Sequence, residues 1–185
     1  MAQRDQKLAS PLYFQGIPGS GKTYAAKSMA KSIAVPLASV NLDGATIDGI
    51  LGTSTDPGRL LLALSNISSN IDEKNYKNTI FFIDEFDRLL NRDDPTSKAV
   101  LSTMLKIFDP TNRKFFSPYL NAEISLPPTI ILAGNYAIKD EALKSRFQVI
   151  EFGGFSQKLK QQIAINMMLP SIADNYQMDL KKLKS

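Results

Sequence analysis

The sequence predicts an α/β protein of three layers, in which helices cover both faces of a central parallel sheet. Short apolar runs suited to strands alternate with runs suited to helices along most of the chain, and such alternation is typical of βαβ units. Residues 79–83, TIFFI, are continuously apolar and β-prone, as expected of a strand covered on both faces. A glycine-rich run at residues 16–23 joins an expected strand to an expected helix. These three observations define the fold class.

The composition limits both the class of protein and its chemistry. The chain has 185 residues, of which 43% are apolar and 22% charged, and this suits one compact domain with a real core. It contains no cysteine, so disulfides and thiolate metal sites are excluded. It also contains no histidine, so its chemistry must use carboxylates, lysine, arginine, amides and a bound hard cation.

Charge and hydropathy favour a cytoplasmic location. The net charge of +4 is spread along the chain, which a solvated surface explains better than a nucleic-acid patch, so nucleic acid is not an expected partner. Residues 1–10 are polar, and no run approaches the roughly 20 apolar residues of a membrane span. We therefore expect a cytoplasmic protein with no membrane partner.

The first expected elements surround the glycine-rich run. Residues 12–14 are apolar and aromatic, as suits a buried strand, and residues 23–34 follow as a helix. Residues 35–42 form the second expected strand, with Pro36 near its start, where proline is tolerated. The helix is expected to bury a face made of Ala26, Met29, Ala30 and Ile33.

A glycine-rich loop and a polar connection flank the next helix. Residues 43–58 contain four glycines and one proline, and we expect a loop there with one helical turn. A leucine-rich helix follows at residues 59–67, and residues 65–78 form an exposed polar connection. The buried strand at residues 79–83 comes next.

The last elements begin with a capped helix. Asp94 before Pro95 is typical of an N-cap followed by a first helical residue, which predicts a helix at residues 95–108. Residues 111–128 are expected to be irregular. Further strands are expected at residues 129–133 and 147–151, and Ser156 caps a helix with an apolar face of Leu159, Ile163 and Met167.

Residues 16–23, GIPGSGKT, fit the pattern Gly-x-x-x-x-Gly-Lys-Thr. A strand that turns into a helix through glycines points backbone N–H groups into one concavity, which suits a polyphosphate. Lys22 can reach the β- and γ-phosphates, and the Thr23 hydroxyl can ligate Mg²⁺. A loop that merely turns the chain is the alternative, and it leaves the terminal Lys-Thr pair unexplained. The expected phosphate-binding residues are Gly16, Pro18, Gly19, Ser20, Gly21, Lys22 and Thr23.

Two adjacent acids, Asp84 and Glu85, close the most hydrophobic strand. Acids at the carboxyl end of a buried strand are costly unless that end opens onto a site. Asp84 is expected to hold Mg²⁺ with Thr23, and Glu85 to orient and polarise an attacking water. The alternative is a pair of solvated loop acids. Asp87 and Arg88 are interpreted as surface charges.

Asn135 and Arg146 are the remaining candidates for catalysis. Asn135 lies two residues past the strand at 129–133, and neighbouring strands of a parallel sheet end at the same edge. Its amide can then reach the γ-phosphate or the water, although an asparagine after glycine also suits an ordinary turn. Arg146 just precedes a strand. It is either a surface residue or a guanidinium that stabilises a transferring phosphoryl group in a neighbouring subunit.

Together these residues resemble the P-loop NTPases of the AAA+ ATPase class. Residues 16–23 look like its Walker A motif, and residues 80–87, IFFIDEFD, look like its Walker B motif. Asn135 matches the sensor-1 position, and residues 142–147 are similar to the segment that carries the arginine finger. All four occur in the expected order.

Within AAA+, the chain resembles the ATPase module of the Lon protease family. Residues 56–59, DPGR, resemble the Pro-Gly-Arg that opens the Lon helix before Walker B. Further likenesses to Lon lie at residues 109–112, Phe116, residues 119–120, residues 149–150 and residues 169–170.

The resemblance implies a fold, an activity and an assembly. The fold is a parallel five-stranded sheet of order 5-1-4-3-2, with a core at residues 11–155 after a polar segment at residues 1–10. Residues 156–185 then begin an α-helical lid. The implied activity is Mg²⁺-dependent hydrolysis of ATP, by attack of a water held by Glu85. The implied assembly is a homo-oligomeric ring, usually a hexamer, that remodels a protein substrate or binds an adaptor.

Three departures from the Lon pattern modify these expectations. Residues 52–55, GTST, lack the aromatic residue of a substrate-gripping loop. The chain stops soon after the first lid helix, without a sensor-2 arginine. No protease domain follows, so we expect an ATPase and not a protease.

Two alternatives stay open: a nucleotide-dependent switch or scaffold with weak hydrolysis, and a DNA-handling AAA+ loader. The dispersed charge speaks against the loader.

Overall fold

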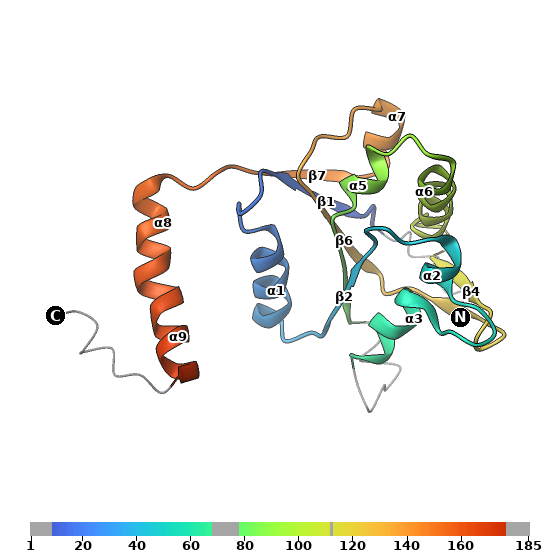
Figure 1. Cartoon of the computed structure of the whole chain (residues 1–185), viewed down its shortest axis with the longest axis horizontal. Helices are drawn as coiled ribbons and strands as arrows, with labels where there is room; N and C mark the ends of the chain where they lie inside the picture. Colours follow the sequence, from blue (N-terminus) through green and yellow to red (C-terminus); the bar gives the residue numbers. More distant parts are fainter. Residues whose placement is uncertain (1–8, 68–77, 112, 177–185) are drawn as a thin grey trace, which may run out of the picture. The chain divides into compact units, whose positions relative to one another are not determined.

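The computed structural model describes residues 9–67, 78–111 and 113–176. Contacts divide the chain into two compact units, one up to Phe152 and one from Gly153. The first unit is a three-layer α/β sandwich (Figure 1). Most of the expected N-terminal segment at residues 1–10 and of the connection at residues 65–78 lies outside the described residues.

A parallel five-stranded sheet forms the centre of the first unit. Its strand order is β2-β3-β6-β1-β7, which confirms the expected order 5-1-4-3-2, because β6 and β7 are the fourth and fifth strands of this sheet along the chain. The strands are β1 (Leu12–Gly16), β2 (Leu37–Asn41), β3 (Ile80–Asp84), β6 (Thr129–Gly134) and β7 (Gln148–Phe152).

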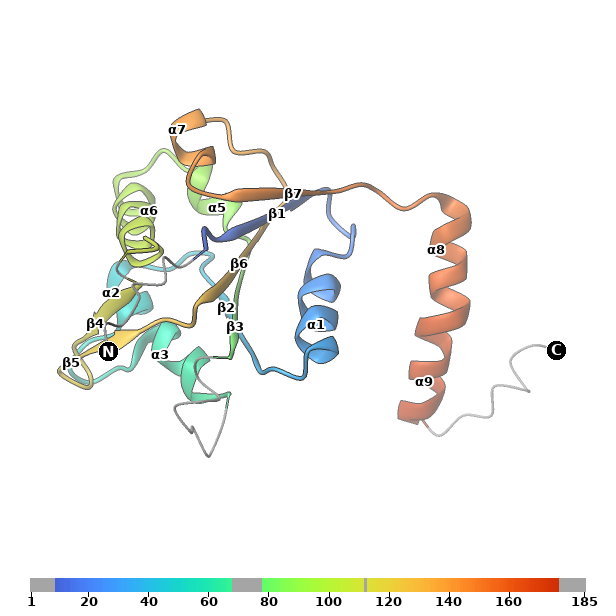
Figure 2. The ribbon, with the colours of Figure 1, turned by 180° about the vertical axis from the view of Figure 1, so that it is seen from behind.

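Helices lie on both faces of this sheet. Figures 1 and 2 show α1 against one face, and α2, α3 and α6 against the other. The helices described in this unit are α1 (Lys22–Ser32), α2 (Ile47–Leu51), α3 (Gly58–Ser65), α5 (Asp87–Leu90), α6 (Pro95–Ile107) and α7 (Glu141–Lys144). The helical turn expected within residues 43–58 is α2, whereas the short helices α5 and α7 were not expected from the sequence.

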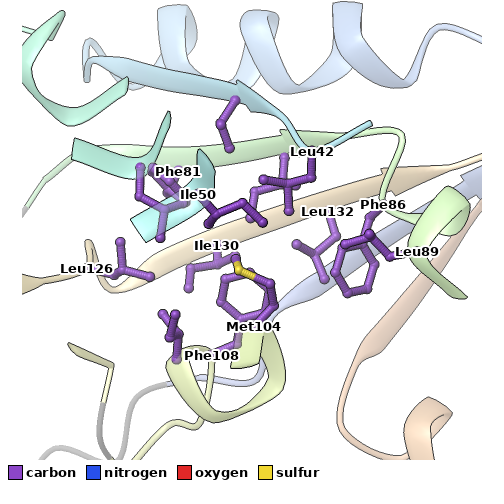
Figure 3. Packing of buried hydrophobic residues seen from close by; sticks show 14 of the residues in the cluster. Leu42, Ile50, Phe81, Phe86, Leu89, Met104, Phe108, Leu126, Ile130 and Leu132 are labelled. Atoms are coloured by element: carbon purple, nitrogen blue, oxygen red, sulfur yellow. The ribbon is translucent and has the colours of Figure 1, made fainter. Parts of the chain in front are cut away.

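The sheet has a hydrophobic core on each face, and alternating residues of β3 pack into one or the other. Phe82 packs with the alanines of α1 on one side of the sheet, and Phe81 packs on the other side. Figure 3 shows this second core, where Met104 of α6 lies among Leu42, Ile50, Phe81, Ile130 and Leu132. Full burial of each such side chain stabilises the fold by roughly 1.5–3 kcal/mol, so this core anchors the strands whose ends form the site.

The buried face of α1 is narrower than the sequence suggested. Ala26 and Ala30 are buried as expected, but Met29 is 41% exposed and Ile33 is 64% exposed. Ile33 is the C-cap residue, past the last helical residue Ser32, and Met29 lies about 100° around the helix from Ala30. The expectation that they belong to the core was wrong.

The end of α1 also lies two residues earlier than expected. Ala34 adopts a left-handed backbone with φ 54°. Its N–H donates to the Lys31 carbonyl, and the N–H of Val35 donates to the Ala30 carbonyl. This is a Schellman-type ending, which satisfies the last helical carbonyls and stops the helix before the strand.

The expectation of irregular structure at residues 111–128 was wrong. Strands β4 (Lys114–Ser117) and β5 (Ala122–Ser125) pair there as an antiparallel hairpin. Phe115 and Ser117 are buried while Lys114 and Phe116 are exposed, so β4 follows the alternation of a half-buried strand. Each strand has only four residues, which is too short a pattern to stand out in the sequence.

The second unit contains one continuous helical run. It comprises α8 (Gln157–Ile163), a π-helical turn η1 (Ala164–Met168) and α9 (Leu169–Tyr176). The Ser156 hydroxyl accepts from the Leu159 N–H, as expected for the N-cap. Pro170 lacks an N–H and crowds the preceding turn, which accounts for the widened η1.

The three residues of the apolar face expected on this helix differ in exposure. Leu159 is exposed and Ile163 is half-buried, while the side chain of Met167 lies outside the described residues. No helix in the described part of the chain is long and apolar enough to span a bilayer.

Candidate active site

A cleft opens where the carboxyl ends of β2, β3 and β6 meet the N-terminus of α1. Its volume is about 460 Å³. Parallel strands present their carboxyl ends at one edge of the sheet, so residues far apart in sequence meet there. The cleft is lined by Pro18, Gly19, Gly21, Lys22, Thr23, Tyr24, Asn41, Asp84, Glu85 and Asn135.

The glycine-rich loop forms one wall of the cleft. Gly21 has φ 91° and precedes α1, a left-handed conformation that glycine adopts without strain. Of the seven expected phosphate-binding residues, Gly16 and Ser20 do not line the cleft. The Gly16 carbonyl contacts Lys22 instead. Ser20 is buried, and within the described residues its hydroxyl has no hydrogen-bond partner.

Lys22 is the central cation of the cleft. Its Nζ donates to the carbonyls of Gly16 and Ile17, at 2.6 and 3.1 Å, and to Asn135 Oδ1 at 2.9 Å. Burial lowers the pKa of Lys22, and the negative charges of Asp84 and Asp87 oppose that shift. The ammonium group thus lies between the glycine-rich loop and the end of β6.

A hydroxyl and a carboxylate meet beside Lys22. Thr23 Oγ1 donates to Asp84 Oδ2 at 3.0 Å. The pair joins the first turn of α1 to the last residue of β3. Hydroxyl and carboxylate oxygens are hard ligands of the kind that Mg²⁺ prefers, so the chemistry of this pair fits the expected cation.

Glu85 is held in a fixed place at the mouth of the cleft. Its backbone is left-handed, with φ 56°, which is uncommon for a residue with a side chain. Its Oε2 accepts from Asn41 Nδ2 at 3.1 Å, and its Oε1 accepts from Arg88 at 2.9 Å. The other nitrogen of Arg88 donates to Asp43. Both carboxylate oxygens therefore have partners.

Asn41 is a functional candidate that the sequence analysis missed. It is the last residue of β2, so it occupies the same edge of the sheet as Asp84 and Asn135. The edge argument that was used for Asn135 would have found it, had the strand been ended at Asn41 and not at residue 42.

The interpretation of Asp87 as a surface charge was wrong. Its side chain is 1% exposed, and its Oδ2 accepts from the Asn135 N–H at 2.9 Å. Asp87 also adds to burial in raising the pKa of Tyr13. Arg88, by contrast, is exposed and pairs with Asp43 and Glu85.

Arg146 is not part of this cleft. It lines a separate pocket of about 130 Å³ together with Phe108, Asp109 and other residues. Its side chain is exposed at the end of the short segment after α7. The structure therefore brings together Lys22, Thr23, Asp84, Glu85 and Asn135, but not Arg146.

Comparison with known proteins agrees with this geometry. The model of the family of ATPases associated with various cellular activities, AAA, matches residues 12–154. The chain belongs to the AAA ATPase family. The match covers all five strands of the central sheet and the whole cleft.

Individual relatives make this AAA protein Lon-like, as the motifs suggested. The peroxisomal Lon protease homolog 2 of Caenorhabditis briggsae is 32% identical over 167 residues, which cover 85% of this chain and 20% of that protein. The Lon protease of Lawsonia intracellularis is 34% identical over 170 residues, covering 86% and 19%. That of Mycoplasma mycoides is 29% identical over 194 residues, covering 98% and 23%. The chain thus spans about a fifth of the length of these relatives.

Proposed function

We propose that this AAA protein hydrolyses ATP in a Mg²⁺-dependent reaction at the cleft between α1 and the sheet edge. The observation that carries the proposal is the convergence of Lys22, Thr23, Asp84, Glu85 and Asn135 on one cleft. These residues supply a cation, a hydroxyl, two carboxylates and an amide. That set meets the needs of phosphoryl transfer, in which positioning and charge stabilisation dominate catalysis.

The triphosphate binds along the glycine-rich loop. The N–H groups at the start of α1 and the partial positive charge of the helix favour an anion there. Lys22 Nζ, now bonded to loop carbonyls and to Asn135, exchanges some of these contacts for phosphate oxygens. Lys22 can then donate both to the nucleotide and to Asn135, whose side chain faces the terminal phosphate.

Thr23 and Asp84 are the residues that hold Mg²⁺, directly or through water. When bound, the ion supplies positive charge to the oxygens of the β- and γ-phosphates. Since Mg²⁺ takes one or two protein carboxylates and fills its other positions with phosphate and water, the Thr23–Asp84 pair is a sufficient protein contribution.

Glu85 holds and deprotonates the attacking water. A carboxylate is the group available for this work because the chain has no histidine. Asn41 and Arg88 hold both of its oxygens, so Glu85 must give up part of that contact, or use its remaining lone pairs, to bind the water.

Arg146 acts on the nucleotide of a neighbouring subunit. This is the alternative that best suits an exposed guanidinium outside its own cleft. It implies a homo-oligomeric ring, usually a hexamer. By analogy with the Lon relatives, the ring acts on a protein substrate or adaptor, and the unit from Gly153 begins its lid. The expected boundary between the core and the lid, at residues 155/156, stays a prediction. The cytoplasmic location also stays a prediction.

A nucleotide-dependent switch with slow hydrolysis is the second candidate. The occupied oxygens of Glu85 favour it, because a carboxylate held on both sides is less free to act as a base. Phosphate release, measured with saturating ATP and Mg²⁺ at several protein concentrations, separates the two. Multiple turnovers support the ATPase, whereas tight ATP binding without turnover supports the switch. The absence of ATP binding would refute both.

A further inference from the structure

Asp87 carries a buried carboxylate that makes one hydrogen bond. Its side chain is 1% exposed. Oδ2 accepts from the Asn135 N–H at 2.9 Å, whereas Oδ1 accepts from no group among the described residues. Burying a carboxylate with an unpaired oxygen costs stability, and an apolar side chain of similar size often stabilises a fold in such a place. Stability does not account for an aspartate in this place, whereas its hydrogen bond acts on the backbone of Asn135.

The backbone at residues 133–136, which we call the Asn135 turn, is held at three points. The Phe86 N–H donates to the Ala133 carbonyl at 2.9 Å. Asp87 accepts from the N–H of Asn135, and the Tyr13 hydroxyl donates to the Tyr136 carbonyl at 2.7 Å. Tyr13 belongs to β1 and Asp87 to α5, so the turn is fixed by two different elements.

The turn also packs closely on these two side chains. A Cβ at Gly134 would lie 2.1 Å from the Tyr13 hydroxyl oxygen and 2.8 Å from the Asp87 Cβ. Real Cβ atoms do not approach that closely, so glycine is required there. The backbone of the Asn135 turn thus has little room to move while Tyr13 and Asp87 are in place.

We propose that Asp87, assisted by Tyr13, is a positioning residue for hydrolysis, because it fixes the Asn135 turn. The Asn135 side chain is short, so its backbone decides where the amide lies. In the observed position Asn135 Oδ1 accepts from Lys22 Nζ at 2.9 Å. If the backbone of the Asn135 turn were released, the Asn135 side-chain amide could move away from Lys22. A displacement of about 1 Å can cost roughly 10²-fold in rate. This inference rests on the proposed function.

The test compares variants that keep or remove the acceptor. Asp87→Asn retains an oxygen that can accept from the Asn135 N–H, whereas Asp87→Ala retains none. We expect Asp87→Ala to lower kcat by roughly 10- to 100-fold, and Asp87→Asn to recover most of that loss. Tyr13→Phe removes one hydroxyl without opening a cavity and should lower kcat by roughly two- to tenfold. ATP affinity should change little in all three.

Hydrogen exchange measures the positioning without any turnover. In Asp87→Ala the backbone N–H of Asn135 should exchange at least about tenfold faster than in the parent, since its acceptor is gone. In Asp87→Asn it should stay protected. The amide of Leu132 in β6 serves as the reference for global unfolding, and its exchange should not change in parallel.

A double-mutant cycle shows whether Asp87 acts through Asn135. When Asp87→Ala is added to an Asn135→Ala variant, kcat should fall further by less than about twofold, because the side-chain amide that Asp87 positions is already absent. Ser97→Ala is the control. Ser97 is also buried, but it lies in α6 away from the cleft, so its effect on kcat should be small in both backgrounds.

Three results would overturn the positioning role. The first is an Asp87→Asn variant with a kcat as low as that of Asp87→Ala. The second is an unchanged exchange rate of the Asn135 backbone N–H in Asp87→Ala. The third is a loss of kcat on adding Asp87→Ala to the Asn135→Ala variant that is as large as the loss in the parent. A parent that neither binds nor hydrolyses ATP would instead refute the proposed function, and the two failures are therefore distinguishable.

Discussion

Thr23 Oγ1 lies 3.0 Å from Asp84 Oδ2, although the two residues are 61 positions apart along the chain. We expect Asp84→Asn to raise the Mg²⁺ concentration needed for half-maximal turnover by roughly 10- to 100-fold, because a charged ligand becomes a neutral one. ATP binding without Mg²⁺ should be nearly unaffected. Titration of turnover with Mg²⁺ measures the shift. Asp48→Asn, at an exposed position in α2, is the control. Equal Mg²⁺ dependence in both variants would exclude Asp84 as a ligand.

The ammonium of Lys22 is predicted to carry much of the affinity for ATP. Lys22→Ala removes a charged donor, and such a hydrogen bond is worth about 1.5–3 kcal/mol. We therefore expect the Kd of a fluorescent ATP analogue to rise by roughly tenfold or more. Lys27→Ala changes an exposed lysine of the same helix and should leave the Kd unchanged. If Lys22→Ala binds as tightly as the parent, the assignment of the phosphate loop is wrong.

The two methionines of α6 and α1 test the assignment of the core. Met104 is fully buried, whereas Met29 is 41% exposed. Met104→Ala should lower the free energy of unfolding by about 3 kcal/mol, and Met29→Ala by less than about 0.5 kcal/mol. Urea unfolding of both variants measures the difference. A large loss in Met29→Ala would restore the wider apolar face that the sequence suggested.

Arg146 is predicted to act between subunits. An arginine supplied in trans is worth roughly 10³–10⁵ in rate, so the specific activity of the parent should rise with protein concentration. Arg146→Ala should abolish that rise while ATP affinity stays nearly intact. Lys144→Ala, an exposed residue of α7, should retain the rise.

Mixing two inactive variants sharpens this test. Arg146→Ala keeps Glu85, and Glu85→Gln keeps Arg146, so interfaces that pair the intact residues should recover part of the turnover. Association of the mixture is checked by light scattering. An associated mixture that recovers no activity would count against action in trans.

Most of the cleft could be predicted from the sequence because local rules governed it. A loop with the terminal pair Lys22 and Thr23 has few structural alternatives, and Asp84 and Glu85 end a strand that is apolar throughout. The rule that parallel strands end at one edge then brought Asn135 to the same place. No long-range packing had to be known for these residues.

The errors arose where tertiary packing decided the outcome. Asp87 follows three other polar or aromatic positions in a turn and looks solvated, yet it is buried under Gly134 and Tyr13. Met29 is apolar, but the close approach of α1 through Ala26 and Ala30 leaves it outside the core. Neither fact follows from the pattern of the neighbouring residues.

Glu85→Gln provides the most direct measurement of the central claim that this cleft hydrolyses ATP with a water held by Glu85. The change keeps the size of the side chain and one accepting oxygen, but it removes the negative charge and replaces the second accepting oxygen with an NH₂ donor. With saturating ATP and Mg²⁺, we expect turnover to fall by roughly 10²–10⁴-fold, the usual effect of losing a positioned base, while the Kd for ATP stays within about threefold of the parent value. Unchanged turnover with saturating ATP and Mg²⁺ would contradict the account.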